Sequence, residues 1–155
     1  MVHGARYIYV ALAWAFVAGL VVQVYLIGLG LFASSDYKEL HRTFGWLLHL
    51  VPPFVLVVAA TARAGRKLIL QTTALTITIF IVPILAAIRA EAPLAAAFHP
   101  LGAVLAFVLA ILVARGATRL LRATDPETPV GLVGWVLVAL LAVIYLVLSL
   151  GGSPA

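Results

Sequence analysis

Histidine is the residue type in this chain best suited to chemistry, and there are four histidines and no cysteine. Imidazole nitrogens bind iron, copper and zinc, whereas a chain without cysteine has no thiolate ligand, iron–sulfur ligand or thiol nucleophile. We expect His3, close to the N-terminus, to be solvated. His41, His49 and His99 lie in or beside apolar stretches, where an ionisable side chain is costly and usually faces a bundle interior. These three histidines are the candidate ligands.

His41 and His99 are expected near the same membrane face, on different helices. Two imidazoles placed in this way meet the requirement of a b-type heme, whose iron takes one axial nitrogen above and one below the porphyrin. His49 follows His41 by eight residues, which is about 12 Å deeper and about 80° around a helix. It could bind a second heme, replace His41 as the partner of His99, or hydrogen-bond to a polar neighbour such as Gln23.

Other residues could support a cofactor at this face. Lys38, Arg42 and Arg89 could pair with heme propionates, although such cations are more often snorkelling residues at the interface. Small residues could lie beneath a flat macrocycle, but they also serve ordinary close packing of helices; they are Gly28, Gly30, Gly45, Gly102 and Ala103. A polar group could line a cavity or bind a quinone, but threonines in lipid usually bond to their own helix; it comprises Gln71, Thr72, Thr73, Thr76 and Thr78.

The composition requires a lipid environment. Of the 155 residues, 65% are hydrophobic and 10% are charged, with a mean hydropathy of +1.21. A soluble domain carries about a quarter charged residues, and a chain this short could not bury so many apolar side chains in its own core. The net charge of +5 does not indicate a nucleic-acid partner, because the cations lie between apolar stretches.

Five stretches are long and apolar enough to cross a bilayer, which needs about 20 residues. They are Tyr7–Phe32, Leu40–Ala62, Leu68–Ile88, Pro100–Leu121 and Val130–Leu150. The sequence therefore predicts an all-α transmembrane bundle, with a four-helix cytochrome-b-like core over residues 1–122 and an additional helix over 130–150. We found no internal repeat in the sequence.

The cations predict an orientation, because short loops rich in lysine and arginine stay in the cytoplasm. Seven cations fall on one side and three on the other: Arg6, Arg63, Arg66, Lys67, Arg115, Arg119 and Arg122, against Lys38, Arg42 and Arg89. This distribution predicts a cytoplasmic N-terminus and, with five spans, an external C-terminus.

Local signals predict how individual helices begin and bend. Asp36 with Glu39 could form a capping box at the start of the second helix. Pro52 and Pro53 should bend that helix, and Pro83 should bend the third. His99 precedes Pro100, which suits the first turn of a helix, so the fourth span should begin there. Residues 90–98 would form an outer loop or a short interfacial helix.

Three segments carry a resemblance to a known family: Gln23 to Phe32, the His41-Arg-Thr-Phe-Gly45 motif, and His99-Pro100. Over roughly residues 10 to 120 the chain resembles a largely uncharacterised family of small four-helix membrane proteins of bacteria and archaea. The resemblance implies a prokaryotic cell membrane and marks Gln23, Gly28, Gly30, His41, Gly45, His99 and Pro100 as recurring positions.

The HRxxG motif at His41 is also similar to that of ferric-reductase-type cytochromes and of succinate dehydrogenase anchor subunits, which hold heme b between helices. The spacing of eight residues between His41 and His49 is shorter than the ligand spacing within one helix of the ferric reductases. This difference argues against a wire of two hemes across the membrane.

The leading hypothesis is a membrane b-type cytochrome-like protein, an electron carrier or the membrane subunit of a redox complex, with His41 and His99 as axial ligands. Its expected partners are the lipid bilayer and other membrane redox subunits or a quinone, and an oligomer is compatible with it. A second hypothesis is a cofactor-free accessory or assembly subunit whose histidines only bond between helices. A third is a copper or zinc site formed by His41, His49 and His99.

Overall fold

The computed structural model describes residues 2–123, 135, 138–139 and 143, and these residues are helical apart from short connections. The helices are α1 Val2–Phe32, α2 Asp36–Leu48, α3 Val51–Thr61, α4 Arg66–Ala87, α5 Pro93–Ala96 and α6 His99–Arg122. Four segments are long and apolar enough to span a membrane: α1, α2 with α3, α4, and α5 with α6. The fifth span expected over 130–150 lies mostly outside the described residues, so it stays a prediction.

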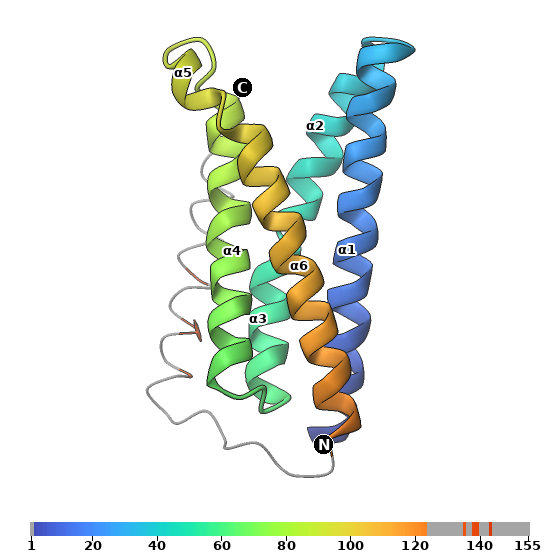
Figure 1. The fold of residues 1–155 in the computed structure, drawn as a ribbon, viewed down its shortest axis with the longest axis vertical. Coiled ribbons are helices and arrows are strands. Elements are labelled where there is room, and N and C mark those ends of the chain that lie inside the picture. The colour runs from blue at the N-terminus through green and yellow to red at the C-terminus, as the bar shows by residue number, and fades with distance from the viewer. Residues whose placement is uncertain (1, 124–134, 136–137, 140–142, 144–155) are drawn as a thin grey trace.

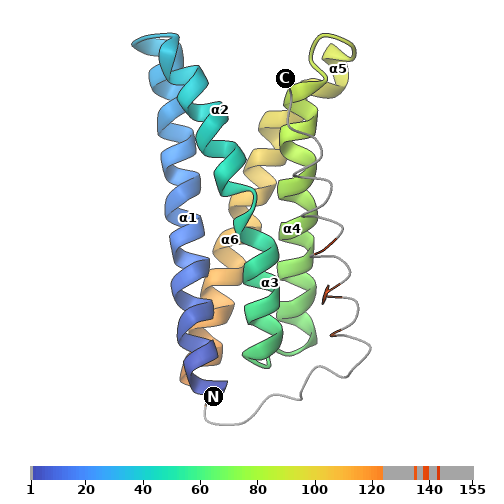
Figure 2. The ribbon, with the colours of Figure 1, turned by 180° about the vertical axis from the view of Figure 1, so that it is seen from behind.

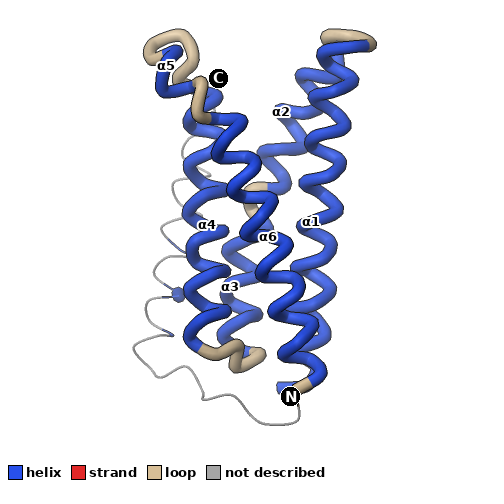
Figure 3. The backbone as a smooth tube through the Cα atoms, viewed as in Figure 1, coloured by secondary structure: helices blue, strands red, loops and turns tan. Residues whose placement is uncertain are grey.

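The helices are close together at one end of the bundle and diverge toward the other (Figures 1 and 2). We call the end that holds the start of α1, the α3–α4 turn and the end of α6 the narrow end. The wide end holds the α1–α2 turn and α5 (Figure 3). Toward the wide end, α2 accompanies α1 while α6 accompanies α4, so the bundle separates into two helical hairpins.

A break in the second span allows this divergence. α2 ends at Leu48 and α3 begins at Val51, with Pro52 and Pro53 in the first turn of α3. Neither proline has a backbone N–H, so the bonds that would continue α2 into α3 are lost, as the sequence predicted. α3 packs against α1 and α4, whereas α2 packs mainly against α1. By contrast, α4 continues through Pro83 as one helix.

The packed core lies in the narrow half of the bundle. Large side chains such as Tyr9, Phe16 and Leu75 are at most 1% exposed there. α6 presents small residues to its neighbours, and Ala106, Ala110, Ala114 and Ala117 are at most 1% exposed. In lipid, helices gain by close packing rather than by leaving water, and small side chains let their backbones approach.

A buried arginine joins two helix ends at the narrow end. The guanidinium of Arg6, 6% exposed, donates to the carbonyl oxygens of Ala62 (3.5 Å), Leu120 (3.0 Å) and Ala123 (3.2 Å). These carbonyls follow or close the last turns of α3 and α6, where helices leave acceptors unpaired and carry partial negative charge. The sequence indicated Arg6 only as one of the topology cations, and its capping of two helices was not predicted.

In the turn after α3, one residue has the left-handed backbone conformation that often follows the end of a helix. Arg63 has φ of 55°, the N–H of Ala64 donates to the carbonyl of Ala59 (3.0 Å), and the N–H of Arg63 donates to that of Ala60 (3.1 Å). This pair of bonds is a Schellman motif, in which glycine usually takes the position that Arg63 occupies here.

The start of α2 differs from the expected capping box. α2 begins at Asp36, but the cap residue is Ser35, which makes no side-chain cap bond. The hydroxyl of Ser34 accepts from the Asp36 N–H (3.3 Å) and donates to the Asp36 carboxylate (3.0 Å). The Glu39 carboxylate instead binds Arg42, whose guanidinium offers a stronger partner than a backbone N–H.

The fourth span begins close to the predicted residue. α6 starts at His99 with Pro100 in its first turn, and the short α5 precedes it within the expected 90–98 segment. Seven of the ten cations belong to the narrow end, and Lys38, Arg42 and Arg89 belong to the wide end. The two groups of cations predicted from the sequence therefore correspond to the two ends of the bundle.

Candidate functional site

His41 lies in the second turn of α2 with its ring against α1. Its Nδ1 is 3.0 Å from the backbone carbonyl oxygen of Gln23. A carbonyl oxygen only accepts hydrogen bonds, so Nδ1 carries the proton and donates it. In the neutral ring, the lone pair that could bind a metal is then on Nε2.

His99, the first residue of α6, is held in the same way. Its Nδ1 is 2.8 Å from the carbonyl oxygen of Val82 in α4, so Nδ1 donates and Nε2 keeps the lone pair. Both rings are partly buried, and among the described residues neither forms another hydrogen bond. Both histidines are therefore fixed in the tautomer that metal-ligating histidines adopt when Nδ1–H bonds to a carbonyl.

A glycine accompanies each histidine about one turn further along its helix. A Cβ on Gly45 would lie 2.5 Å from Nε2 of Gln23, and a Cβ on Gly102 would lie 2.9 Å from Cγ2 of Val82. The residue that gives its carbonyl to the histidine thus also places its side chain over the glycine. These glycines make room for a neighbouring helix, and their space is already taken by protein.

The two hairpins therefore repeat one local arrangement. The histidine follows its carbonyl partner by 18 residues in the α1–α2 hairpin and by 17 in the α4–α6 hairpin. The two acceptor residues, Gln23 and Val82, differ in side chain, so the shared geometry leaves no matching letter at these positions. The signal that could have revealed the geometry is the pair His41 with Gly45 and His99 with Gly102, at spacings of four and three residues.

The residues expected to form one site lie in separate places in the structure. Gln23, His41 and Gly45 come together, but no hydrogen bond within the described residues joins this group to His99. His49 follows the last residue of α2, is 5% exposed, and packs edge-on against Trp46 with ring centroids 4.8 Å apart. Its surroundings therefore differ from those of His41, whose ring is partly buried and bonds to the carbonyl of Gln23.

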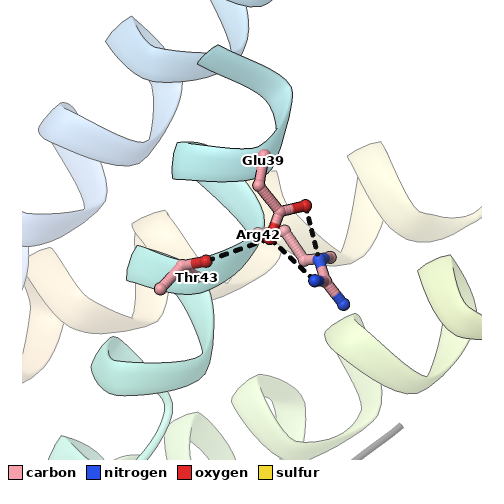
Figure 4. A network of polar contacts seen from close by, with 3 residues as sticks. All are labelled: Glu39, Arg42 and Thr43. Atoms are coloured by element: carbon pink, nitrogen blue, oxygen red, sulfur yellow. Dashed lines mark hydrogen bonds and ion pairs between the residues drawn. The ribbon is translucent and has the colours of Figure 1, made fainter. Parts of the chain in front are cut away.

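Two of the three cations at the wide end, Arg42 and Arg89, already have protein partners. Arg42 binds Glu39 through two hydrogen bonds, Nε to Oε2 (3.0 Å) and Nη2 to Oε1 (2.7 Å), and Thr43 donates to the same carboxylate (3.3 Å) (Figure 4). Arg89 donates to the carbonyl of Ala86 (3.4 Å). The Arg42–Glu39 pair is exposed, so exchanging its partner for another carboxylate costs little.

The threonines of α4 mainly serve the helix itself. Thr72, Thr76 and Thr78 each donate to the carbonyl four residues earlier, as threonines in lipid commonly do. Thr72 also bonds the buried hydroxyl of Tyr9 (2.8 Å), which ties α1 to α4. These contacts favour the structural interpretation of the polar group over a quinone site.

Within the described residues, no group of three or more His, Asp or Glu side chains is placed to hold a metal ion. The arrangement of His41, His49 and His99 consequently gives no support to a three-histidine copper or zinc site. Two separate imidazoles are enough for an axially ligated heme, which brings four nitrogen ligands of its own.

Comparison with known proteins gives a match to a family model. Residues 23–90 match a family of unknown function (DUF6220). The matched segment contains Gln23, His41 and Gly45 and ends before His99. No curated protein and no solved structure matches the chain.

Proposed function

We propose that this chain is a b-type cytochrome-like membrane protein, an electron carrier or the membrane subunit of a redox complex. In this proposal His41 and His99 would hold the heme iron. One observation carries it: two histidines on different helices, at the same end of an apolar bundle, both donate Nδ1–H to a carbonyl of the neighbouring helix. Both rings consequently offer Nε2, the nitrogen available to a ligand.

The donor set fits heme b. The carbonyls of Gln23 and Val82 hold each ring in one tautomer, and such an anchor also makes the other nitrogen more basic. When bound, heme supplies one-electron redox chemistry, which needs no acid or base from the protein. The apolar helices exclude water. Arg42 is next to His41 in the sequence, and its exposed guanidinium can exchange Glu39 for a heme propionate.

The absorption spectrum of protein purified from heme-replete cells tests this proposal. We expect a Soret band and a low-spin spectrum. His41→Ala and His99→Ala should each abolish heme retention or give a high-spin species with one axial ligand, whereas His49→Ala should keep the low-spin spectrum. His3→Ala is the matched control, because His3 is exposed near the start of α1.

Each other outcome of this series has a definite meaning. Loss of heme in His49→Ala but not in His41→Ala would make His49 the partner of His99. Absence of a Soret band with ample heme supply would reject the cytochrome proposal.

A cofactor-free accessory or assembly subunit is the second candidate. The same two bonds favour it, since each already joins a histidine to the next helix without any ligand. In that case the purified protein lacks a Soret band, and His41→Asn, which can also donate to a carbonyl, keeps much of the stability that His41→Ala loses. A retained heme would exclude this candidate.

We also propose that the narrow end faces the cytoplasm of a prokaryotic cell. The support is the seven cations at that end against three at the wide end. A periplasm-dependent reporter fused after Arg122 should be inactive, and one fused after Ala155 should be active if 130–150 forms a fifth span. Activity after Arg122 would reverse the orientation.

A further inference from the structure

Three arginines form a continuous basic face on the last turns of α6. Arg115, Arg119 and Arg122 are all exposed, and their spacing of four and three residues places them on one side of the helix. From the first to the last they cover about 10 Å along the axis. The face begins at Arg115, in the apolar part of α6, and ends at Arg122, the last residue of the helix, at the narrow end of the bundle.

None of these arginines has an anionic partner in the described part of the chain. The acidic residues there are Asp36, Glu39 and Glu91, all in segments of the wide end. The ion pair found among the described residues joins Glu39 to Arg42, far from α6's last turns. Like charges four residues apart on a helix repel each other, so anions from outside the described chain would stabilise this face.

A tryptophan from α1 is fixed against the same face. The indole Nε1 of Trp14 donates to the hydroxyl of Thr118 (3.1 Å), which in turn donates to the carbonyl of Ala114 (2.8 Å). Thr118 lies three residues after Arg115 and four before Arg122, so it belongs to the arginine side of α6. Trp14 stays 44% exposed, and tryptophan is enriched at the level of lipid headgroups.

The described residues of the C-terminal segment lie elsewhere. Val138 and Trp135 pack with Leu56 and Ala60 of α3. Figures 1 and 2 show α3 and α6 on opposite sides of the bundle, so Trp135 and Val138 do not cover the arginine side of α6.

We propose that Arg115, Arg119 and Arg122, together with Trp14, bind the phosphate headgroup of an anionic phospholipid; we call these four residues the arginine face. Guanidinium groups match phosphate oxygens through paired N–H donors. A zwitterionic headgroup carries its own cation beside the phosphate. Three arginines with no acidic neighbour among the described residues therefore favour a lipid with net negative charge. In the proposed complex, the exposed ring of Trp14 contacts the lipid beside its headgroup.

Quenching of Trp14 tests the proposal directly. In a Trp46→Phe, Trp135→Phe background Trp14 is the remaining tryptophan. The protein is placed in phosphatidylcholine vesicles containing a fixed minor fraction of either brominated phosphatidylglycerol or brominated phosphatidylcholine. We expect the anionic brominated lipid to quench Trp14 well beyond its share of the bilayer, and the zwitterionic one only in proportion to its share.

Charge-matched variants separate a site from general attraction. Arg115→Gln with Arg119→Gln should lower the relative association constant of the anionic lipid by about fivefold for each arginine removed. Arg66→Gln with Lys67→Gln removes the same charge from the α3–α4 side of the narrow end and should leave quenching nearly unchanged. Native mass spectrometry gives a second measurement, with all three tryptophans kept. The Arg115→Gln, Arg119→Gln variant should retain less anionic lipid than the Arg66→Gln, Lys67→Gln variant.

Two results would overturn the proposal. One is equal quenching by the two brominated lipids. The other is an equal loss in both double variants, which would mean that the lipid responds to the overall charge of this end and not to the arginine face.

Discussion

The narrow and wide halves of the bundle share the same helices but hold them together differently. The narrow half has buried large side chains, alanine contacts along α6, and Arg6 closing two helix ends. The wide half has two hairpins that diverge, each closed by one histidine–carbonyl bond. Stability is therefore concentrated away from the candidate ligands, and the wide half can change its contacts without unfolding the whole bundle.

Loss of Arg6 should have the largest effect on stability. Arg6→Met removes three hydrogen bonds that a charged donor makes, and the carbonyls of Leu120 and Ala123 lose this donor. We therefore expect the free energy of unfolding to fall by about 3 kcal/mol. Unfolding in mixed detergent micelles measures this change. Lys67→Met, an exposed cation of the same end, is the control and should change stability little. Equal effects would mean that net charge, not capping, matters at this end.

Overpacking should distinguish the two halves of one helix. Ala110→Leu inserts a larger side chain where the alanine is 1% exposed, and should cost about 2 kcal/mol. Ala103→Leu makes the same change about two turns closer to the wide end, where the residue is exposed, and should stay within about 0.5 kcal/mol. Comparable losses in the two variants would contradict a core confined to the narrow half.

The two hairpins can be compared through their glycines. Gly102→Ala should cost about 1 kcal/mol, because the new Cβ meets the stiff, β-branched side chain of Val82 and pushes α6 away from the carbonyl that holds His99. Gly45→Ala should cost less, since it meets the flexible end of the Gln23 side chain while the His41 bond uses the backbone. Unfolding measurements and the imidazole NMR signals of both variants check this order.

Arg63→Gly should produce the smallest change, and in the opposite direction. Arg63 has φ of 55°, a conformation that glycine adopts without a Cβ penalty, so the variant should gain up to about 1 kcal/mol. Arg66→Gly, at the first residue of α4, is the comparison and should not stabilise the protein. A loss of stability in Arg63→Gly would show that the arginine side chain itself supports the turn.

The sequence predicted the helices well because apolar length and proline position act locally. The break at Pro52 and Pro53 and the start of α6 at His99 depend only on neighbouring residues. Contacts between distant residues were not predictable in the same way. Arg6 finds its acceptors 56 to 117 residues away, and a lone arginine near a membrane face has the pattern of a topology signal.

The sequence indicated which histidines to consider, but not which groups hold them in place. Hydropathy drew attention to His41 and His99, because an imidazole in an apolar stretch is unusual. Their partners are backbone carbonyls, which every residue has, so no letter of the sequence marks Gln23 or Val82 as the acceptor. For the glycines the sequence left two interpretations open, a place beneath a cofactor or ordinary close packing of helices, and Gly45 and Gly102 make room for those same two residues.

Arg6 also sets an order for biosynthesis. It enters the membrane with the first helix, but two of its three acceptors, Leu120 and Ala123, are made more than a hundred residues later. Of its three carbonyl acceptors, only that of Ala62 is present before α6 has been synthesised. The first span therefore inserts with a cation that is still hydrated or paired with lipid, and the narrow end closes only after the last described helix has arrived.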